Sequence, residues 1–187
     1  MHIITARSLA VVLLALSSAV VAATPSQRHF TLPNHGSFDL VAPSDWTDEL
    51  TQPPGDLPPT IQFGPRSGPS FQVLVSAGGV PAVGATVPDD AKIRAEVAAA
   101  AKAAESQSVE KSLPLLTLTG PSGSGYYFVA TDRAPALGEW KYLTQGIIRV
   151  DDIVLVFSIL TNDGQEATVK AALEMLRNAV HKLSGAV

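Results

Sequence analysis

Residues 153–160, with the sequence IVLVFSIL, constrain the fold more than any other segment of the chain. Successive side chains of a β-strand point to opposite faces of its sheet. Both faces are apolar here, with Ile153, Leu155, Phe157 and Ile159 on one and Val154, Val156 and Leu160 on the other. A strand of this type is expected in a sheet that other elements cover on both sides. We therefore predict a central strand in a sheet flanked by helices.

Period-2 patterning and turn residues predict further strands on both sides of this segment. They lie at residues 28–32, 36–42, 61–63, 71–77, 109–119, 125–131 and 140–150. The turn at Asp151 and Asp152 is short, so the strands on its two sides are expected to pair antiparallel as a hairpin.

Two segments have helical periodicity instead. An alanine-rich run begins after Pro88 and the acidic pair Asp89–Asp90, which suit the positive end of a helix, and ends near residues 106–108. A closing helix is expected to be capped by Asp163. Its predicted buried stripe consists of Val169, Leu173, Leu176, Val180 and Leu183.

Residues 1–23 have the order of charge, apolar run and small residues that is typical of a secretory signal peptide. Arg7 precedes an apolar run at residues 9–21, which is shorter than the roughly 20 residues that span a bilayer. We expect cleavage before Thr24, leaving residues 24–187 as a single domain in the periplasm or outside the cell, without a stable membrane span. An uncleaved N-terminal anchor is the alternative.

The chain contains no cysteine and has a formal net charge of −4 at pH 7. The lack of cysteine excludes disulfides, thiolate metal sites and a lipoprotein anchor. No cluster of basic residues marks a nucleic-acid surface. The histidines His29, His35 and His181 are too scattered for a metal-ligand motif, and no cofactor motif is present.

The most tempting catalytic set is His35, Ser37 and Asp39, which one strand would place on a common face. Neighbours two apart on a strand lie about 6.5–7 Å apart, which is too far for a nucleophile and its base. These residues therefore indicate the solvent side of a half-buried strand. By similar reasoning, residues 120–125 (GPSGSG) predict a strand connection, and Asp151–Asp152 predicts a solvated turn.

Loops carry recognition more often than the scaffold that holds them. Residues 51–59, 78–88 and 132–139 form connections that are longer than a simple meander needs. The last of these combines charged residues with Leu137 and is followed by Trp140. We predict a partner surface made by Arg133, Leu137 and Trp140, with an ordinary hairpin connection as the alternative.

The segment FDLVAPSDW, residues 38–46, contains an aromatic strand and a Pro43-x-x-Trp46 step. Together with the order of strands, a helix, meandering strands and a terminal helix, it resembles the PsbP-like fold family. The resemblance implies an α/β (α+β) fold in which a central, mostly antiparallel sheet is flanked by helices as an α/β/α sandwich. It also implies binding in place of catalysis.

The sequence thus predicts a small exported accessory protein that lacks catalytic activity and acts through a protein partner in the cell envelope. Two alternatives stay open: a hydrolase whose polar site is assembled from distant residues, and a carrier of a small apolar ligand.

Overall fold

The computed structural model describes residues 24–32, 36–52, 54, 58–78 and 87–183. The predicted signal peptide, residues 1–23, lies outside the described residues, as do His35 and most of the predicted connection at residues 78–88. Among the described residues, no helix is both long and apolar enough to cross a membrane.

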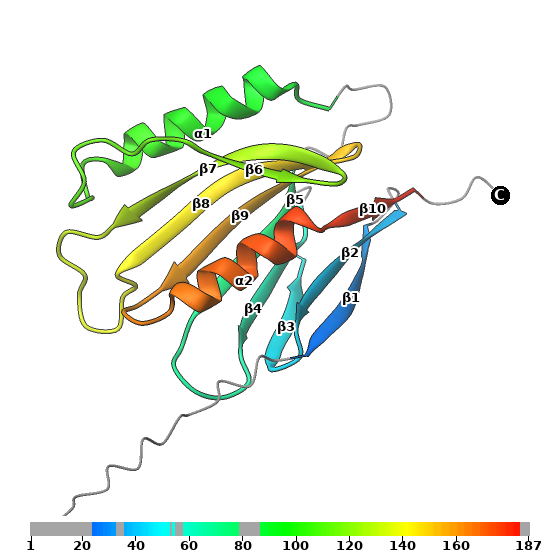
Figure 1. Cartoon of the computed structure of the whole chain (residues 1–187), viewed down its shortest axis with the longest axis horizontal. Coiled ribbons are helices and arrows are strands. Elements are labelled where there is room, and N and C mark those ends of the chain that lie inside the picture. Colours follow the sequence, from blue (N-terminus) through cyan, green and yellow to red (C-terminus); the bar gives the residue numbers. More distant parts are fainter. Residues whose placement is uncertain (1–23, 33–35, 53, 55–57, 79–86, 184–187) are drawn as a thin grey trace, which may run out of the picture.

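The described residues form two antiparallel sheets and two helices (Figure 1). The small sheet has the order β1-β2-β10, with β1 at Pro25–Leu32, β2 at Gly36–Pro43 and β10 at Val180–Lys182. The large sheet has the order β3-β4-β5-β9-β8-β7-β6. Its strands are β3 Trp46–Thr51, β4 Thr60–Pro65, β5 Gln72–Gly78, β6 Leu116–Gly120, β7 Gly123–Thr131, β8 Tyr142–Val150 and β9 Ile153–Thr161. The helices are α1 Asp90–Ala104 and α2 Glu166–Arg177.

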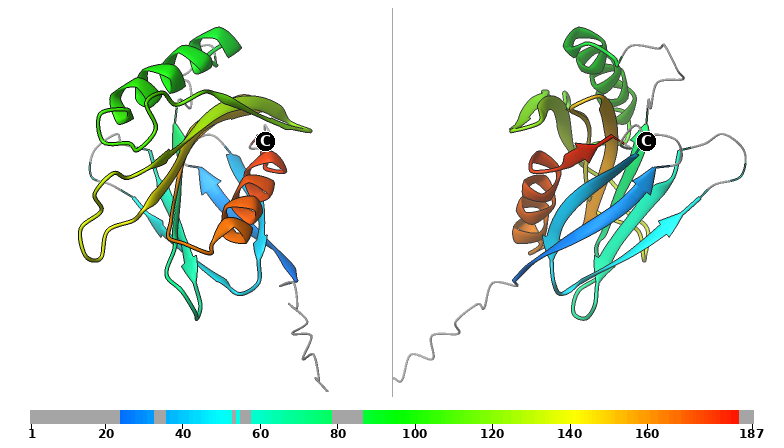
Figure 2. Two further views of the ribbon diagram at one scale, coloured as in Figure 1. Left: turned by 60° about the vertical axis from the view of Figure 1, so that its left-hand side comes forward. Right: turned by 90° about the vertical axis from the view of Figure 1, so that its right-hand side faces the viewer.

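The elements are stacked in layers (Figure 2). Helix α1 covers β7 and β8 on one face of the large sheet, and α2 packs against β2 and the opposite face of the large sheet. The predicted mixed α/β fold with an antiparallel sheet between helices is thereby confirmed. The small sheet lies beside α2 on this opposite face of the large sheet. There the apolar side chains of the small sheet are buried against the large sheet.

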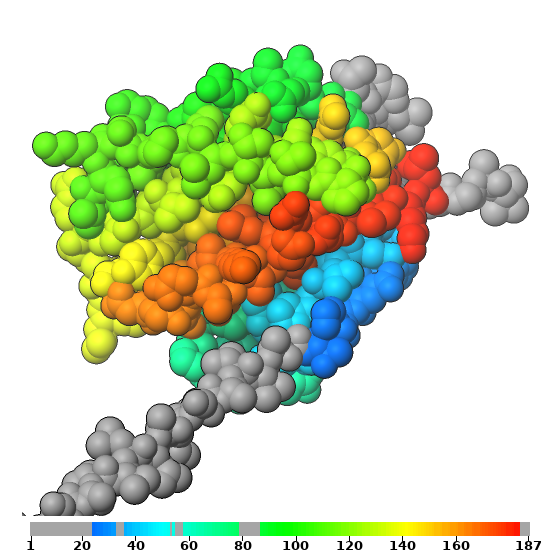
Figure 3. Space-filling view, in the orientation of Figure 1, coloured from blue at the N-terminus to red at the C-terminus, as the bar shows by residue number. Residues whose placement is uncertain are grey.

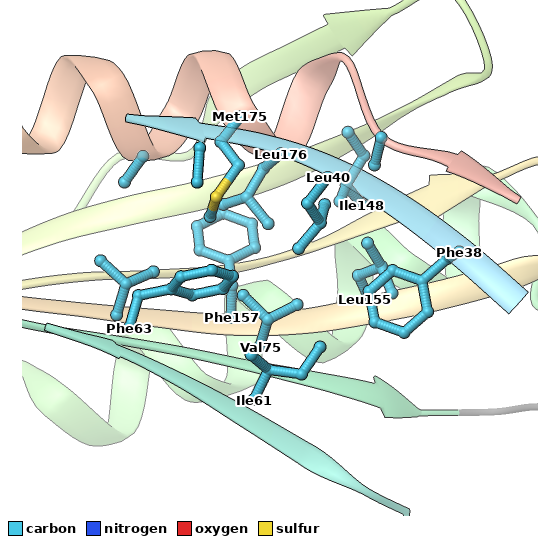
Figure 4. Close-up of a cluster of buried hydrophobic side chains, with 14 of the residues drawn as sticks. Phe38, Leu40, Ile61, Phe63, Val75, Ile148, Leu155, Phe157, Met175 and Leu176 are labelled. Carbon is cyan, nitrogen blue, oxygen red and sulfur yellow. The ribbon is translucent and has the colours of Figure 1, made fainter. Parts of the chain in front are cut away.

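The main core lies between the large sheet, α2 and the small sheet (Figure 4). Phe38 of β2 and Leu176 of α2 are buried there with Phe63 and Phe157 of the large sheet. Trp46, the tryptophan of the Pro-x-x-Trp step, is buried with its ring centroid 4.7 Å from that of Phe71. The step therefore places an aromatic anchor where the chain passes from the small sheet to the large one.

Strand β9 is buried completely on one face only. Ile153, Leu155, Phe157 and Ile159 are at most 1% exposed. On the other face Val154 is buried but Val156 is 37% exposed, because α1 lies over β7 and β8 and leaves part of β9 uncovered. The expectation that both faces of this strand are fully buried is thus wrong for Val156.

Helix α1 forms as the sequence predicts. The Asp89 side chain caps it by accepting a hydrogen bond of 2.8 Å from the backbone N–H of Lys92. Ile93, Val97 and Ala101 are its buried residues. The hairpin at Asp151–Asp152 is also confirmed, with Asp151 in the left-handed region at φ 54°.

The closing helix is shorter than predicted. It begins at Glu166, and Asp163 does not cap it. After Arg177 the chain turns and pairs with β2 as β10, so Val180 is a strand residue that is 41% exposed, and Leu183 is 71% exposed.

The predicted strand at residues 109–119 starts only at Leu116. Strand β3 was not predicted, because five of its six residues are exposed and lack the alternating pattern.

Candidate functional site

The candidate site is centred on the loop between β7 and β8, which protrudes at the end of the large sheet opposite the C-terminus (Figure 1). The backbone N–H of Asp132 donates to the carbonyl of Lys141 over 2.8 Å and closes the loop at its base. The Asp132 side chain accepts from the N–H of Ala134, and the Glu139 carboxylate accepts from the N–H of Ala136, each over 2.8 Å. The loop is therefore held by its own hydrogen bonds.

Arg133 fastens this loop to the segment that follows α1. Its backbone N–H donates to the carbonyl of Gln107 over 2.9 Å, and its guanidinium Nη2 donates to the carbonyl of Ser108 over 2.8 Å. Arg133 thus lies at the base of the loop, and its side chain orients the loop from there.

Leu137 lies beyond that base and is completely exposed, at 107% of the reference accessibility. Gly138 follows it with φ 90°, which a residue with a side chain rarely adopts. The glycine lets the chain turn back directly after Leu137, so the leucine is presented without cover from its own loop.

Trp140 is half-buried in the wall of a pocket of about 360 Å³ beside the loop. The end of α1, the ends of β7 and β9 and the start of β8 contribute the other walls. The lining residues are Ala104, Gln107, Ser108, Ala130, Thr131, Asp132, Glu139, Trp140, Lys141, Tyr142, Leu143 and Leu160. Of the three predicted residues, Trp140 therefore lines a cavity, Leu137 projects from the loop and Arg133 holds its base.

A carboxylate that the sequence did not single out stabilises the region beneath this pocket. Glu110 accepts hydrogen bonds from the Ser108 hydroxyl, from the Thr131 hydroxyl over 2.7 Å and from the Thr131 N–H over 3.0 Å. The Ser108 hydroxyl is the main cause that lowers the pKa of Glu110 to about 2. Glu110 is therefore ionised at neutral pH and holds the segment before β6 against the end of β7.

An ion pair lies beside the pocket, which Lys141 and Tyr142 help to line. The Lys141 ammonium is 2.8 Å from Oδ1 of Asp163, and the Tyr142 hydroxyl donates to the same oxygen over 2.7 Å. The hydrogen bond with Asp163 raises the pKa of Lys141, and that with Lys141 lowers the pKa of Asp163. Asp163, which the sequence predicted as a helix cap, thus serves to fix the start of β8 instead.

The other sequence candidates lie elsewhere. The expectation that Asp39 faces solvent is wrong: it lies on the outer face of the small sheet but is only 5% exposed. Its carboxylate is covered by Lys182 (2.5 Å), His29 (2.7 Å) and Gln27 (2.9 Å). Residues 120–125 comprise the end of β6, the turn of the β6–β7 hairpin and the start of β7. Asp152 pairs with the buried His181. Within the part of the chain that the structure describes, no group of three or more metal-ligating side chains occurs.

No protein-family model matches the chain, and no curated protein sequence matches it either. Among solved structures, the solution structure of cyanobacterial PsbP (CyanoP) from Synechocystis sp. PCC 6803 aligns with a TM-score of 0.51 at 11% sequence identity, over 90% of this chain and 99% of that one. The chain therefore has a PsbP-like fold, as the sequence predicted.

A crystal structure from Bacteroides thetaiotaomicron VPI-5482 also aligns, with a TM-score of 0.47 and 17% identity over 80% of this chain. The chain spans 46% of the length of that protein.

Proposed function

We propose that this protein is a small exported accessory protein without catalytic activity, which binds a protein partner through the β7–β8 loop. The PsbP-like fold supports an accessory role. The pattern of charge, apolar run and small residues in residues 1–23 supports export to the periplasm or the cell exterior.

The observation that carries the binding proposal is the exposure of Leu137 on a loop whose backbone is already ordered. An apolar side chain loses water when it enters a partner's pocket, which contributes roughly 1.5–3 kcal/mol for a residue of this size. Ordering a loop opposes binding, and the hydrogen bonds of Asp132, Arg133 and Glu139 reduce that cost before the partner arrives. The pocket that Trp140 lines lies beside the loop that carries Leu137, and it offers a recess for a side chain of the partner.

Site-specific photocrosslinking in the native host tests this proposal. A photoreactive p-benzoylphenylalanine in place of Leu137 should give one dominant crosslinked protein, whereas the same group in place of Thr47, exposed on β3, should not. The partner should then bind the Leu137→Asp variant more weakly in purified form. Equal binding of this variant and the parent protein would overturn the proposal.

A carrier of a small apolar ligand is the second candidate, because Trp140, Leu143 and Leu160 line a pocket of about 360 Å³. Mass spectrometry of organic extracts of the purified protein should then detect a bound compound that Trp140→Ala reduces.

A further inference from the structure

Strand β6 is an edge strand of the large sheet. It pairs with β7 on one side, and no strand of the described residues pairs with its other side (Figure 1). Figure 3 shows the β6–β7 hairpin reaching the surface between α1 and α2. An edge strand has backbone N–H and C=O groups that are available to another extended chain.

The two edges of the large sheet differ in how well they are protected. The opposite edge, β3, carries Asp48 and Glu49, and the Arg28 side chain covers it by donating to the carbonyl of Trp46 over 3.2 Å. Charged residues on an edge oppose the addition of a further strand. Strand β6 has the sequence LTLTG and carries no charge. It is therefore the edge that accepts an added strand more readily.

The two faces of β6 differ in chemistry. Leu116 and Leu118 point toward the side of α2, where Leu118 is buried and Leu116 is 42% exposed. Thr117 and Thr119 alternate with them, are exposed and line a hollow next to α1. A strand added to β6 would likewise place alternate side chains on these two sides.

The α1 side of this edge carries two arginines and one carboxylate, Asp90, which lines both of the hollows there. Arg94 of α1 lines a hollow of about 790 Å³ with Leu115 and Tyr126. Arg149 of β8 lines an adjoining hollow of about 430 Å³ with the two threonines of β6. Neither arginine has a hydrogen bond or an ion pair with another residue of the described chain.

The nearby carboxylate of Asp90 is already engaged. It accepts a hydrogen bond of 2.7 Å from the Tyr126 hydroxyl, and the guanidinium carbon of Arg94 lies 5.9 Å from the centroid of the Tyr126 ring. Tyr126 and Asp90 line both hollows, and Asp90 forms no ion pair with Arg94 or Arg149 within the described residues, so both guanidinium groups remain open to anions from outside the chain.

We propose that an extended segment of a partner protein, with acidic and apolar residues in alternation, adds to the free edge of β6. Its backbone pairs with β6, its carboxylates lie toward Arg94 and Arg149, and its apolar side chains pack on Leu116. Backbone pairing supplies affinity in this mode of recognition, and the alternate side chains supply specificity. Carboxylate–guanidinium pairs at an exposed edge are weakened by salt, so the affinity should fall as ionic strength rises.

The probe is a synthetic heptapeptide, Glu-Val-Glu-Val-Glu-Val-Glu, acetylated and amidated at its ends and added to the ¹⁵N-labelled protein. Amide resonances of β6 should shift on titration, and β6 amides that exchange quickly in the free protein should exchange at least tenfold more slowly in the complex. A peptide with serine in place of every glutamate should bind at least tenfold more weakly, as should a peptide with N-methylated backbone amides.

The double variant Arg94→Glu/Arg149→Glu tests whether the two guanidinium groups attract the carboxylates of the peptide. Both side chains are exposed, so the variant should fold, and its affinity for the peptide should be at least tenfold lower. Arg66→Glu, at an exposed position beyond β4, is the matched control and should bind like the parent. Absence of any shift at β6 up to millimolar peptide, shifts confined to other strands, or equal binding by the double variant would each overturn the proposal.

Discussion

The guanidinium group of Arg133 donates a hydrogen bond to the backbone carbonyl of Ser108 over 2.8 Å. This bond joins the β7–β8 loop to the segment between α1 and β6. Ser108 is itself 1% exposed and lies next to Asp132 in an isolated β-bridge. Arg133 therefore connects the projecting loop to a buried part of the scaffold.

Replacement of Arg133 by alanine should loosen the loop and lower the free energy of unfolding by about 1 kcal/mol, since a charged hydrogen-bond donor is lost at a partly exposed site. Hydrogen exchange should become faster at the amides of Ala134 and Ala136. Arg66→Ala removes an exposed arginine with no side-chain bond in the described structure, and it should change the free energy of unfolding by less than about 0.5 kcal/mol. Unchanged exchange in Arg133→Ala would mean that the loop orders itself without this anchor.

Leu137→Asp should separate binding from stability. The side chain is fully exposed, so denaturant unfolding should give a free energy within about 0.5 kcal/mol of the parent value. Binding to the crosslinked partner should weaken by more than about 1 kcal/mol, which marks a contributing interface residue. A loss of stability instead would show that Leu137 packs on the protein in solution.

Local patterns predicted most of the elements because each strand and helix carries its own periodicity. The β8–β9 hairpin and α1 are examples, since a short turn and a capping aspartate act over a few residues. Strand β10 was missed because three residues are too few to show a period, and its position depends on pairing with β2. Lys182 and Asp39, which meet across these strands, are 143 positions apart in the chain.

The sequence predicted the position of the β7–β8 connection, but not the contacts that its residues make. Glycine, proline and charge marked residues 132–139 as a distinctive connection. The contact of Arg133 with Ser108 spans 25 positions, and the bonds of Glu110 with Thr131 span 21. No local pattern announces such contacts, because they depend on how β7 and the end of α1 are brought together.

The buried face of α2 is defined by Ala172, Met175 and Leu176. Leu176 is 0% exposed, whereas Leu173 of the predicted stripe is only partly buried. Leu176→Ala should therefore lower the free energy of unfolding by about 2–5 kcal/mol, and Leu173→Ala should lower it by less. Urea denaturation of the two variants side by side checks this order. Equal or reversed losses would mean that α2 is rotated about its axis relative to the structure.

Asp39 is expected to make stability depend on pH. The hydrogen bond from Lys182, followed by that from His29, lowers the pKa of the Asp39 carboxyl. A carboxyl group that is more acidic in the folded chain stabilises the fold fully above its unfolded pKa of about 3.9. This contribution is lost as the pH falls through the lower folded value.

Asp39→Asn should consequently be less stable than the parent protein at pH 7, by about 1–2 kcal/mol for the loss of charged hydrogen bonds. The difference between the two proteins should shrink as the pH falls below about 5 and through the lowered pKa of the folded chain, because the parent carboxyl then takes up its proton. Urea unfolding at a series of pH values measures both effects. Asp45→Asn, at an exposed position between β2 and β3, serves as the matched control and should follow the pH profile of the parent. A parallel profile for Asp39→Asn would show that Lys182 and His29 do not hold this carboxylate in solution.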